Sequence, residues 1–279
     1  MRLLPRPIDL LNRSVNVRGL RIARAIAYGE HPRQAMDIYS PVGQAPAPVI
    51  VFFYGGSWQG GARADYRFIA TLLAAHGYVV AVPDYRIYPP TCFPGFVEDT
   101  TRAICFVREQ IEHYGGSGEA LFAMGHSAGA YNAVMAALAP DAPALCGVIG
   151  LAGPYDFLPL KDPVIKTIFS GPEDLRSTQP ITHAHPAAAP MFLATGAADR
   201  TVLPRNTTAM AARLRHLGAV VETKIYPSLG HTGILLAMLP YLTWRAPVLR
   251  DVLGFCAACR AGDYATGSET AKDMVRRPL

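Results

Sequence analysis

Five consecutive residues near the middle of the chain have the types and order that present a serine hydroxyl for nucleophilic attack. They are Gly125, His126, Ser127, Ala128 and Gly129. The apolar run 121–124 before them predicts a buried strand, and residues 130–138 after them are rich in strong helix formers. A strand that enters a helix through G-x-S-x-G holds its serine at the sharpest point of the turn. A glycine-rich turn with a solvated serine would share these five letters, so the interpretation depends on partners elsewhere in the chain.

Two further side chains could turn Ser127 into a nucleophile. A serine hydroxyl reacts poorly at neutral pH, so it needs a base, and the base needs an acid to orient it. After such a turn the partners follow in the order Ser, acid, His. Asp199 follows the apolar run 191–195 and His231 follows the predicted strand 220–226, and sites in such sheets form at the carboxyl ends of the strands. The sequence therefore predicts a catalytic triad of Ser127, Asp199 and His231.

Other residues compete for these roles. Asp156 follows the strand one step earlier and is the alternative acid, but the strand before Asp199 ends in the Gly-containing turn that is typical of the acid's loop. Among the histidines, His183 and His185 form an H-x-H pair that could suggest a metal site. No third ligand at zinc spacing accompanies them, so we expect neither a metal nor another cofactor.

The remaining requirement is a set of N–H groups aimed where negative charge develops on the substrate. One donor comes with the serine turn, the backbone N–H of Ala128. A second is expected from the loop after the predicted strand 49–53. That loop reads Tyr54-Gly55-Gly56-Ser57-Trp58. Because glycines let backbone N–H groups approach a ligand closely, this loop is the predicted second half of an oxyanion hole.

Apolar runs and helical periods alternate along most of the chain. Strands are expected at 20–28, 34–40, 48–53, 78–82, 121–124, 145–151, 191–195 and 220–226, and helices at 64–76, 96–114, 130–138 and 205–217. This alternation predicts an α/β protein with a mostly parallel central sheet and helices on both faces. Residues 153–190 have no clear period and are expected to pass over one end of the sheet. An apolar helical region interrupted by Pro240 and Pro247 is expected after residue 230.

Composition limits what the protein can be. The 279 residues are 51% hydrophobic and 17% charged, which is typical of a well-packed soluble protein. With no internal repeat and no second boundary, we predict a single domain over 1–279, with a core over about 20–260, a basic N-terminal arm and a polar C-terminal tail. The net charge of +5 comes largely from the arginine-rich start, where no aromatic residue interleaves, so nucleic acid is not an expected partner.

Three further expectations concern membranes, location and cysteines. No apolar run is long enough to cross a bilayer, so we expect no stable membrane insertion. The first residues lack the apolar centre of a secretory signal, so a cytoplasmic location is expected. Cys256 and Cys259 are spaced C-x-x-C within an apolar, helix-like stretch, and we interpret them as buried thiols and not as a redox pair.

Together these motifs resemble those of esterase-type α/β hydrolases, in the group that includes the BD-FAE and kynurenine-formamidase-like enzymes, near the hormone-sensitive-lipase group. The matching motifs, between Ile26 and Phe255, are YGGSW at 54–58, DYR at 84–86, GHSAGA at 125–130, PITH at 180–183, Gly-x-x-Asp at 196–199 and Gly-His at 230–231. The resemblance implies an α/β-hydrolase fold with a minimal cap. It also implies Ser127, Asp199 and His231 as the triad.

The same resemblance implies oxyanion-hole donors among Gly55, Gly56, Ser57 and Ala128, and of these we predict Gly56, Ser57 and Ala128. The family usually begins this loop with His, whereas the present chain has Tyr54. We expect the Tyr54 hydroxyl to brace the loop as the family's histidine does. Because the long N-terminal cap of the lipase-like members is missing, we expect a small or open substrate site, with Trp58 and Tyr88 among its walls.

These expectations define a cofactor-independent serine hydrolase that cleaves small-molecule carboxylic esters of short-chain acids through an acyl-enzyme. An aryl formamidase acting on an N-formylkynurenine-type amide is the alternative, because it would use the same triad. It would also need a polar partner for the amino-acid end of its substrate. Arg86 is the one basic residue that the sequence places nearby, and it could equally be a structural partner of Asp84 or Glu98. A binding module on a hydrolase scaffold is a third interpretation, disfavoured because all three triad residues are present. The oligomeric state is left open.

Overall fold

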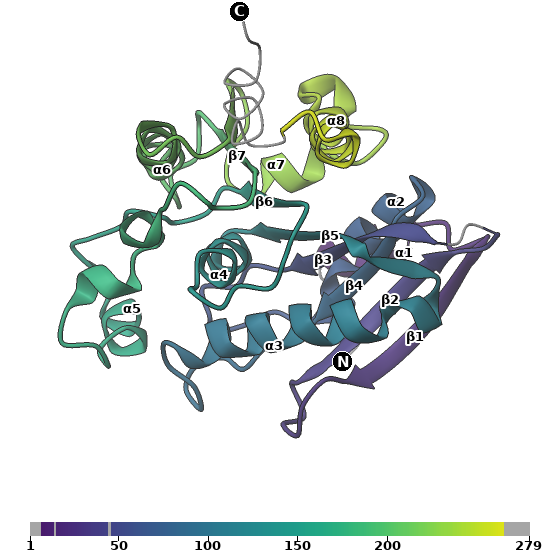
Figure 1. Ribbon diagram of the computed structural model, residues 1–279, viewed down its shortest axis with the longest axis horizontal. Helices are drawn as coiled ribbons and strands as arrows, with labels where there is room; N and C mark the ends of the chain where they lie inside the picture. The colour runs from purple at the N-terminus through teal and green to yellow at the C-terminus, as the bar shows by residue number, and fades with distance from the viewer. Residues whose placement is uncertain (1–6, 14, 44–45, 265–279) are drawn as a thin grey trace, which may run out of the picture.

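The computed structural model describes residues 7–13, 15–43 and 46–264. Its centre is an eight-stranded sheet in the order β1-β2-β4-β3-β5-β6-β7-β8 (Figure 1). The strands are β1 Leu20–Ala27, β2 Ala35–Pro41, β3 Ala47–Phe53, β4 Val79–Pro83, β5 Gly116–His126, β6 Gly147–Leu151, β7 Met191–Gly196 and β8 Val221–Tyr226. Strand β2 pairs antiparallel with β1 and β4, and the other neighbours pair in parallel. The predicted mostly parallel sheet is confirmed.

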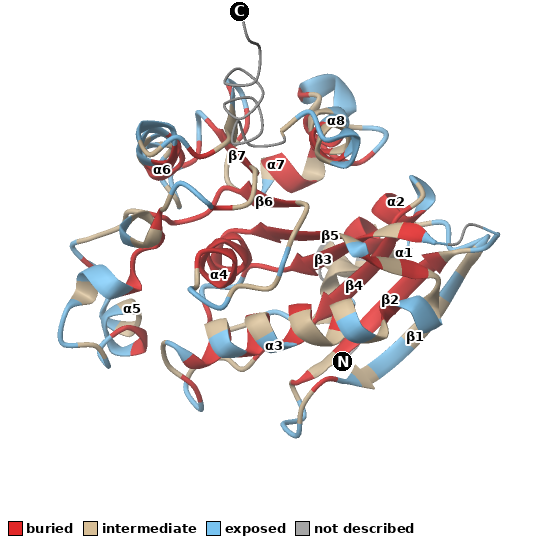
Figure 2. Ribbon diagram, in the orientation of Figure 1, coloured by how far each residue is buried: buried red, intermediate tan, exposed pale blue. Residues whose placement is uncertain are grey.

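Helices cover both faces of this sheet. The α-helices are α1 Pro7–Arg13, α2 Arg67–Ala75, α3 Gly95–Gln110, α4 Ala128–Ala137, α5 Pro163–Ile168, α6 Arg205–His216, α7 Gly233–Leu236 and α8 Val248–Ala261. In Figure 1, α3 and α4 lie next to each other on one side of the sheet, and α2 and α8 lie on the other. Every residue of β4, β6 and β7 is buried (Figure 2). Strands between two helical layers have no solvent face, which explains their continuous apolar runs.

Two regions differ from the sequence-based expectation. Strand β5 begins at Gly116 and not at residue 121, because Gly116 pairs with Ala47 of β3 across a register shift. The expected apolar helical region after residue 230 is divided into α7 and α8, with Pro240 and Pro247 between them. Proline lacks the N–H that a helix interior needs, so the chain cannot continue as one helix there.

The segment between β6 and β7 leaves the sheet and carries α5, which lies apart from the strands in Figure 1. It also contains the 3₁₀ turns Leu175–Thr178 and Pro180–His183. Asp162 caps α5, because its carboxylate accepts the N–H groups of Val164 at 2.8 Å and Ile165 at 2.9 Å. At the end of α5, the ring of Phe169 packs on that of Trp58 with centroids 4.9 Å apart. This contact joins the segment, called the excursion from here on, to the loop that follows β3.

Residues 1–6 and 14 of the expected basic arm, and residues 265–279 of the expected polar tail, lie outside the described residues. The part of the arm in α1 is ordered against the start of α2. Asn12 donates its side-chain amide to the carbonyl of Ala64 at 3.0 Å and accepts the N–H of Phe68 at 3.0 Å. Among the described residues, no helix is both long and apolar enough to cross a membrane.

Candidate active site

The serine turn joins β5 to α4. Ser127 has a φ of 55° and a ψ of −123°, a backbone conformation that side chains other than glycine rarely adopt. A Cβ on Gly125 would lie 2.2 Å from the carbonyl oxygen of Gly129, and a Cβ on Gly129 would lie 2.1 Å from that of Phe53. The neighbouring strand and helix therefore leave no room for side chains beside the serine. The turn places Ser127 at the carboxyl end of β5, where it lines a cavity.

Three side chains form a continuous hydrogen-bonded chain at the carboxyl ends of the strands. His231 Nε2 lies 2.9 Å from Ser127 Oγ, and His231 Nδ1 lies 2.8 Å from Asp199 Oδ2. The other carboxylate oxygen of Asp199 accepts the backbone N–H groups of Thr201 and Val202, each at 2.9 Å. These bonds hold the buried carboxylate in one orientation toward the imidazole. The structure therefore brings together the three predicted triad residues, from the segments that follow β5, β7 and β8.

The alternative acid, Asp156, has a different place in this network. Its backbone N–H donates to Asn206 Oδ1 at 2.9 Å, and the N–H of Tyr155 donates to the same oxygen at 3.0 Å. The Nδ1 hydrogen bond of His231 is made with Asp199. The geometry thus favours Asp199 as the orienting acid and places Asp156 in a loop that is tied to the start of α6.

His126, inside the serine turn, contacts the loop that carries His231. Its Nε2 lies 2.9 Å from the backbone carbonyl of His231, so this nitrogen donates and we assign the Nε2–H tautomer. The centroids of the two imidazoles are 4.8 Å apart. Burial, reinforced by the nearby His231, lowers the pKa of His126 to about 4. Near pH 7 His126 is therefore neutral and supports the loop of the base. The sequence did not predict this contact, because it depends on tertiary packing.

The N–H groups expected to stabilise an oxyanion lie close to the serine. Ser57 and Ala128 line the same cavity as Ser127. In the described part of the chain, neither backbone N–H donates to another protein group, so both are free for a ligand. Gly56, the third predicted donor, is not among the described residues that line this cavity, and its carbonyl accepts the N–H of Gln59 at 2.9 Å. Of the three expected donors, Ser57 and Ala128 are thus the ones that reach the cavity.

Tyr54 holds the start of the oxyanion loop through its hydroxyl. The hydroxyl donates to Asp84 Oδ1 at 2.7 Å and accepts from Arg33 Nη2 at 2.8 Å. The Tyr54 carbonyl accepts the hydroxyl of Tyr85 at 2.7 Å, and the two rings stack with centroids 5.0 Å apart. Asp84 also accepts from Arg63, through its backbone N–H at 2.6 Å and its guanidinium. Tyrosine at this position therefore braces the loop, as the sequence analysis expected.

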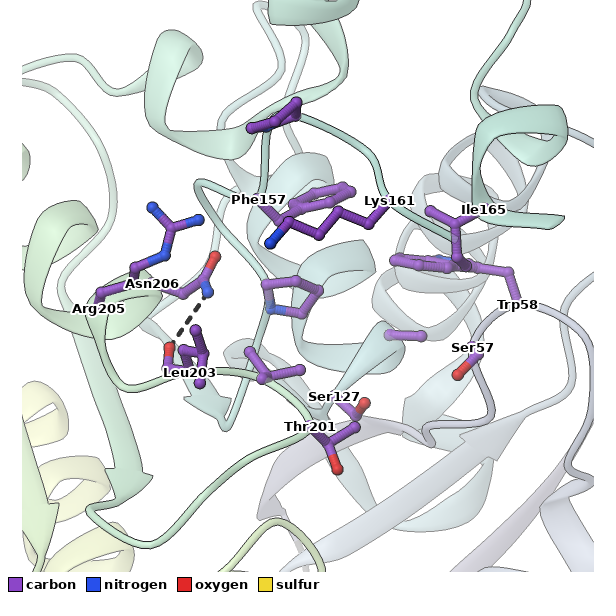
Figure 3. A pocket seen from close by; sticks show the side chains of 14 residues that line it. Ser57, Trp58, Ser127, Phe157, Lys161, Ile165, Thr201, Leu203, Arg205 and Asn206 are labelled. Carbon is purple, nitrogen blue, oxygen red and sulfur yellow. Dashed lines mark hydrogen bonds between the residues drawn. The ribbon is translucent and has the colours of Figure 1, made fainter. Parts of the chain in front are cut away.

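A cavity of about 310 Å³ opens beside Ser127 (Figure 3). The aromatic rings of Trp58 and Phe157 and the side chain of Ile165 give it an apolar lining, from the oxyanion loop and the excursion. Leu203, which is 49% exposed, comes from the segment after β7. The excursion therefore supplies part of the lining of this cavity.

The two predicted substrate-binding aromatics have different positions. Trp58 lines the cavity, and its Nε1 donates to Asn132 Oδ1 at 2.9 Å, which fixes the indole. Tyr88 is not among the described residues that line the cavity. Its backbone N–H instead donates to the Trp58 carbonyl at 2.8 Å. Tyr88 thus supports the loop that carries Trp58, through its backbone.

Arg86, the basic residue that the sequence placed near the substrate, does not line the cavity. Arg86 pairs with the buried Asp99 at 2.8 Å and with Glu98 at 3.4 Å, and its backbone N–H donates to Asp99 at 2.7 Å. It is therefore a structural partner of α3. Lys161 and Arg205 line the cavity instead. Sequence reasoning missed both because neither belongs to a recognisable motif.

In the part of the chain that the structure describes, no group of three or more His, Cys, Asp or Glu side chains is placed to hold a metal ion. His183 of the H-x-H pair has its Nε2 2.7 Å from the Ser177 carbonyl. Cys256 and Cys259 lie on α8, where burial raises the pKa of each thiol to about 12. Neither is a thiolate near pH 7. The expected independence from cofactors stays a prediction.

A mostly parallel sheet with a serine in a glycine-flanked strand-to-helix turn, followed in sequence by an acid and a histidine after later strands, defines an α/β-hydrolase fold. The chain belongs to the BD-FAE family, whose model matches residues 36–214. The matched residues include Ser127 and Asp199 and end before His231. The family resemblance drawn from the sequence motifs is confirmed.

Individual relatives agree with this assignment. The chain is 28% identical over 246 residues to a probable isoprenylcysteine alpha-carbonyl methylesterase of Arabidopsis thaliana, which covers 77% of this chain and 52% of that protein. It is 32% identical over 142 residues to a kynurenine formamidase of Danio rerio, and this match covers 48% of this chain and 47% of that protein. The chain thus spans about half the length of these curated relatives. The crystal structure of esterase B from Lactobacillus rhamnosis shares the fold, with a TM-score of 0.79, 17% identity and 92% coverage of both chains.

Proposed function

We propose that the protein is a serine hydrolase that cleaves carboxylic esters of short-chain acids, with Ser127, Asp199 and His231 as its catalytic triad. One observation carries this proposal. Hydrogen-bond distances of 2.8 and 2.9 Å link Asp199 through His231 to Ser127 Oγ, at the edge of a cavity. The similarity to a probable methylesterase supports the reaction class. No cofactor is part of the proposal, because the three side chains supply the nucleophile, the base and the orienting acid.

In the first half-reaction, Ser127 Oγ attacks the acyl carbon while His231 Nε2 takes its proton. Asp199 holds the Nδ1–H of His231 and stabilises the imidazolium that forms. The N–H groups of Ser57 and Ala128 stabilise the negative charge that develops on the former carbonyl oxygen. The imidazolium then gives its proton to the departing alcohol, and the acyl group stays on Ser127.

In the second half-reaction, His231 takes a proton from water as the water attacks the acyl carbon, and Ser127 leaves with that proton. His126 contributes through position and charge. Its Nε2–H holds the backbone carbonyl of His231, and its neutral ring adds no positive charge beside the imidazolium that must form twice in each turnover.

The cavity favours small substrates. Its volume of about 310 Å³ is at the lower end of the roughly 300–1,000 Å³ that ligand pockets span. A longer acyl chain gains about 0.8 kcal/mol per methylene only where a groove buries it. We therefore propose small-molecule esters with short acyl chains as substrates, with no nucleic acid and no membrane partner in the mechanism.

An aryl formamidase is the second candidate, which the match to the Danio rerio kynurenine formamidase favours. The same triad would act on a formamide, but His231 must protonate an amine as it leaves, which demands closer positioning than an alkoxide does. Arg86, the side chain considered for the amino-acid end of that substrate, is paired with Asp99. We therefore favour the ester.

The test compares kcat/KM for ethyl butyrate and for N-formylkynurenine on one preparation each of the wild type and Ser127→Ala. We expect the higher kcat/KM for the ester, and a loss of about 10⁴-fold or more in the variant. A tenfold higher kcat/KM for the formamide would show that the protein is an aryl formamidase and not an esterase. Full activity of the variant on both substrates would refute the proposal and its alternative together.

A further inference from the structure

Two cationic side chains line the cavity that contains Ser127. Lys161 lies in the excursion, just before α5, and Arg205 is the first residue of α6. Figure 3 shows the ammonium group of Lys161 and the guanidinium of Arg205 on one side of the cavity, away from the Ser127 hydroxyl, and Trp58 and Ile165 on the other. Two segments far apart in the sequence thus bring positive charge to one part of the site.

Within the described residues, no ion pair or hydrogen bond engages the Lys161 ammonium or the Arg205 guanidinium. Arg86, in contrast, has a buried carboxylate partner in Asp99 at 2.8 Å. The carboxylate next to Lys161 in sequence, that of Asp162, accepts two N–H groups at the start of α5. Lys161 and Arg205 are therefore available to an anion from outside the protein.

The polar side chain of Asn206, next to Arg205, is already hydrogen-bonded within the protein. Asn206 Oδ1 already accepts the backbone N–H groups of Tyr155 and Asp156, and its Nδ2 donates to the Leu203 carbonyl at 3.1 Å (Figure 3). Helix α6, which is 12 residues long, begins at Arg205 and adds a partial positive charge at its N-terminus. Lys161 and Arg205 are both exposed, and together with this helix end they make one side of the cavity positive.

We propose that Lys161 and Arg205 bind a carboxylate carried by the ester substrate, so that the protein prefers esters with a free carboxylate over neutral esters of the same shape. A carboxylate accepts two parallel hydrogen bonds from a guanidinium and a further one from an ammonium. This inference rests on the proposed function, because it names the substrate class of the Ser127 site. Since the anion binds away from the reacting carbon, its contribution is expected mainly in KM.

The experiment uses two pairs of esters with matched shapes. Monoethyl succinate carries the carboxylate on its acyl half, and ethyl isocaproate is its neutral counterpart. Acetoxyacetate carries the carboxylate on its alcohol half, and isobutyl acetate is its neutral counterpart. For the wild type at low salt, we expect kcat/KM to be about tenfold higher for the anionic member of at least one pair, with the preference falling as salt is added. The preferred pair identifies which half of the substrate lies beside the two cations.

Variants separate the carboxylate site from the catalytic residues. Lys161→Ala and Arg205→Ala are each expected to lower kcat/KM for the preferred anionic ester by about three- to tenfold, mainly through KM, and to lower that of its neutral counterpart by a smaller factor. Arg205→Gln keeps a long polar side chain at the start of α6 and repeats the test if the alanine variant is unstable. Arg213→Ala, at an exposed position on the same helix, is the matched control and should change neither ester.

The outcomes distinguish this inference from the proposed function. Equal kcat/KM values within both pairs, while esters are cleaved, would overturn the carboxylate site and leave the esterase proposal intact. Equal losses on anionic and neutral esters in the Lys161 and Arg205 variants would overturn it as well. Failure of the wild type to cleave any of the four esters would refute the proposed function itself. Competitive inhibition by free succinate, weaker in the Lys161→Ala, Arg205→Ala double variant, would support the site independently of turnover.

Discussion

Acid should destabilise the protein through His126. Its pKa is lowered from an ordinary 6.5 to about 4 in the folded protein, first by burial and then by the nearby His231. Between these two values the unfolded chain binds more protons than the folded protein does, so the free energy of unfolding falls as the pH is lowered. Well above about pH 6.5 the residue is neutral in both states and contributes no pH dependence.

The size of the effect follows from the two pKa values. Their difference is about 2.5 (6.5 minus about 4), and each pKa unit corresponds to about 1.4 kcal/mol. His126 should therefore lower the free energy of unfolding by roughly 3 kcal/mol as the pH falls from about 6.5 through about 4. This is a large share of the roughly 5–15 kcal/mol that stabilises a typical domain.

The assay is urea denaturation of the wild type and His126→Gln at several pH values between about 7 and about 4. The glutamine amide can still donate to the His231 carbonyl but does not titrate, so the stability difference between the two proteins should change by roughly 3 kcal/mol across this range. His216→Gln, at an exposed position at the end of α6, is the control and should follow the wild type. Parallel pH profiles for the wild type and His126→Gln would refute the reasoning.

Three further predictions concern the site. Asp199→Asn should lower kcat by about 10⁴-fold because the amide favours the wrong imidazole tautomer, whereas Asp156→Asn should cost less than about threefold; the reverse order in steady-state kinetics would make Asp156 the acid. Tyr54→Phe should lower the free energy of unfolding by about 1–3 kcal/mol, because Asp84 and Arg33 each lose a partner, and should reduce kcat more than it raises KM. Unchanged stability and kcat would show that the hydroxyl does not hold the loop. Among esters of increasing acyl length, kcat/KM should be highest for acyl groups of about two to six carbons, and a maximum at about ten carbons or more would contradict the size of the cavity.

The sequence predicted those parts of the fold that depend on residues close together in the chain. The serine turn follows from steric limits on five adjacent residues, and Gly125 and Gly129 have the close contacts that those limits imply. The buried strands follow from continuous apolar runs. The positions of Asp199 and His231 follow from a rule about strand ends, since each comes directly after a strand.

The misses concern long-range packing. Tyr88 was expected among the walls of the substrate site, but it is not among the described residues that line the cavity, and its backbone N–H donates to the Trp58 carbonyl. Arg86 was considered both for the substrate and as a structural partner of Asp84 or Glu98. It pairs with Glu98 and more closely with Asp99 on α3, and no local pattern shows which acid an arginine will meet. Lys161 lies in a segment without periodicity, so its place beside the serine emerges only when the excursion folds back over the sheet.

The most direct test of the account is the covalent labelling of Ser127. The wild type and Ser127→Ala are incubated with a fluorophosphonate, and intact-protein and peptide mass spectrometry are run beside an ester-hydrolysis assay. We expect the wild type to gain one adduct, on Ser127, and to lose activity in step with labelling, while Ser127→Ala gains none and is inactive with an unchanged melting curve. An adduct on another residue, or a variant that retains about a tenth of wild-type activity, would contradict the assignment of Ser127 as the nucleophile.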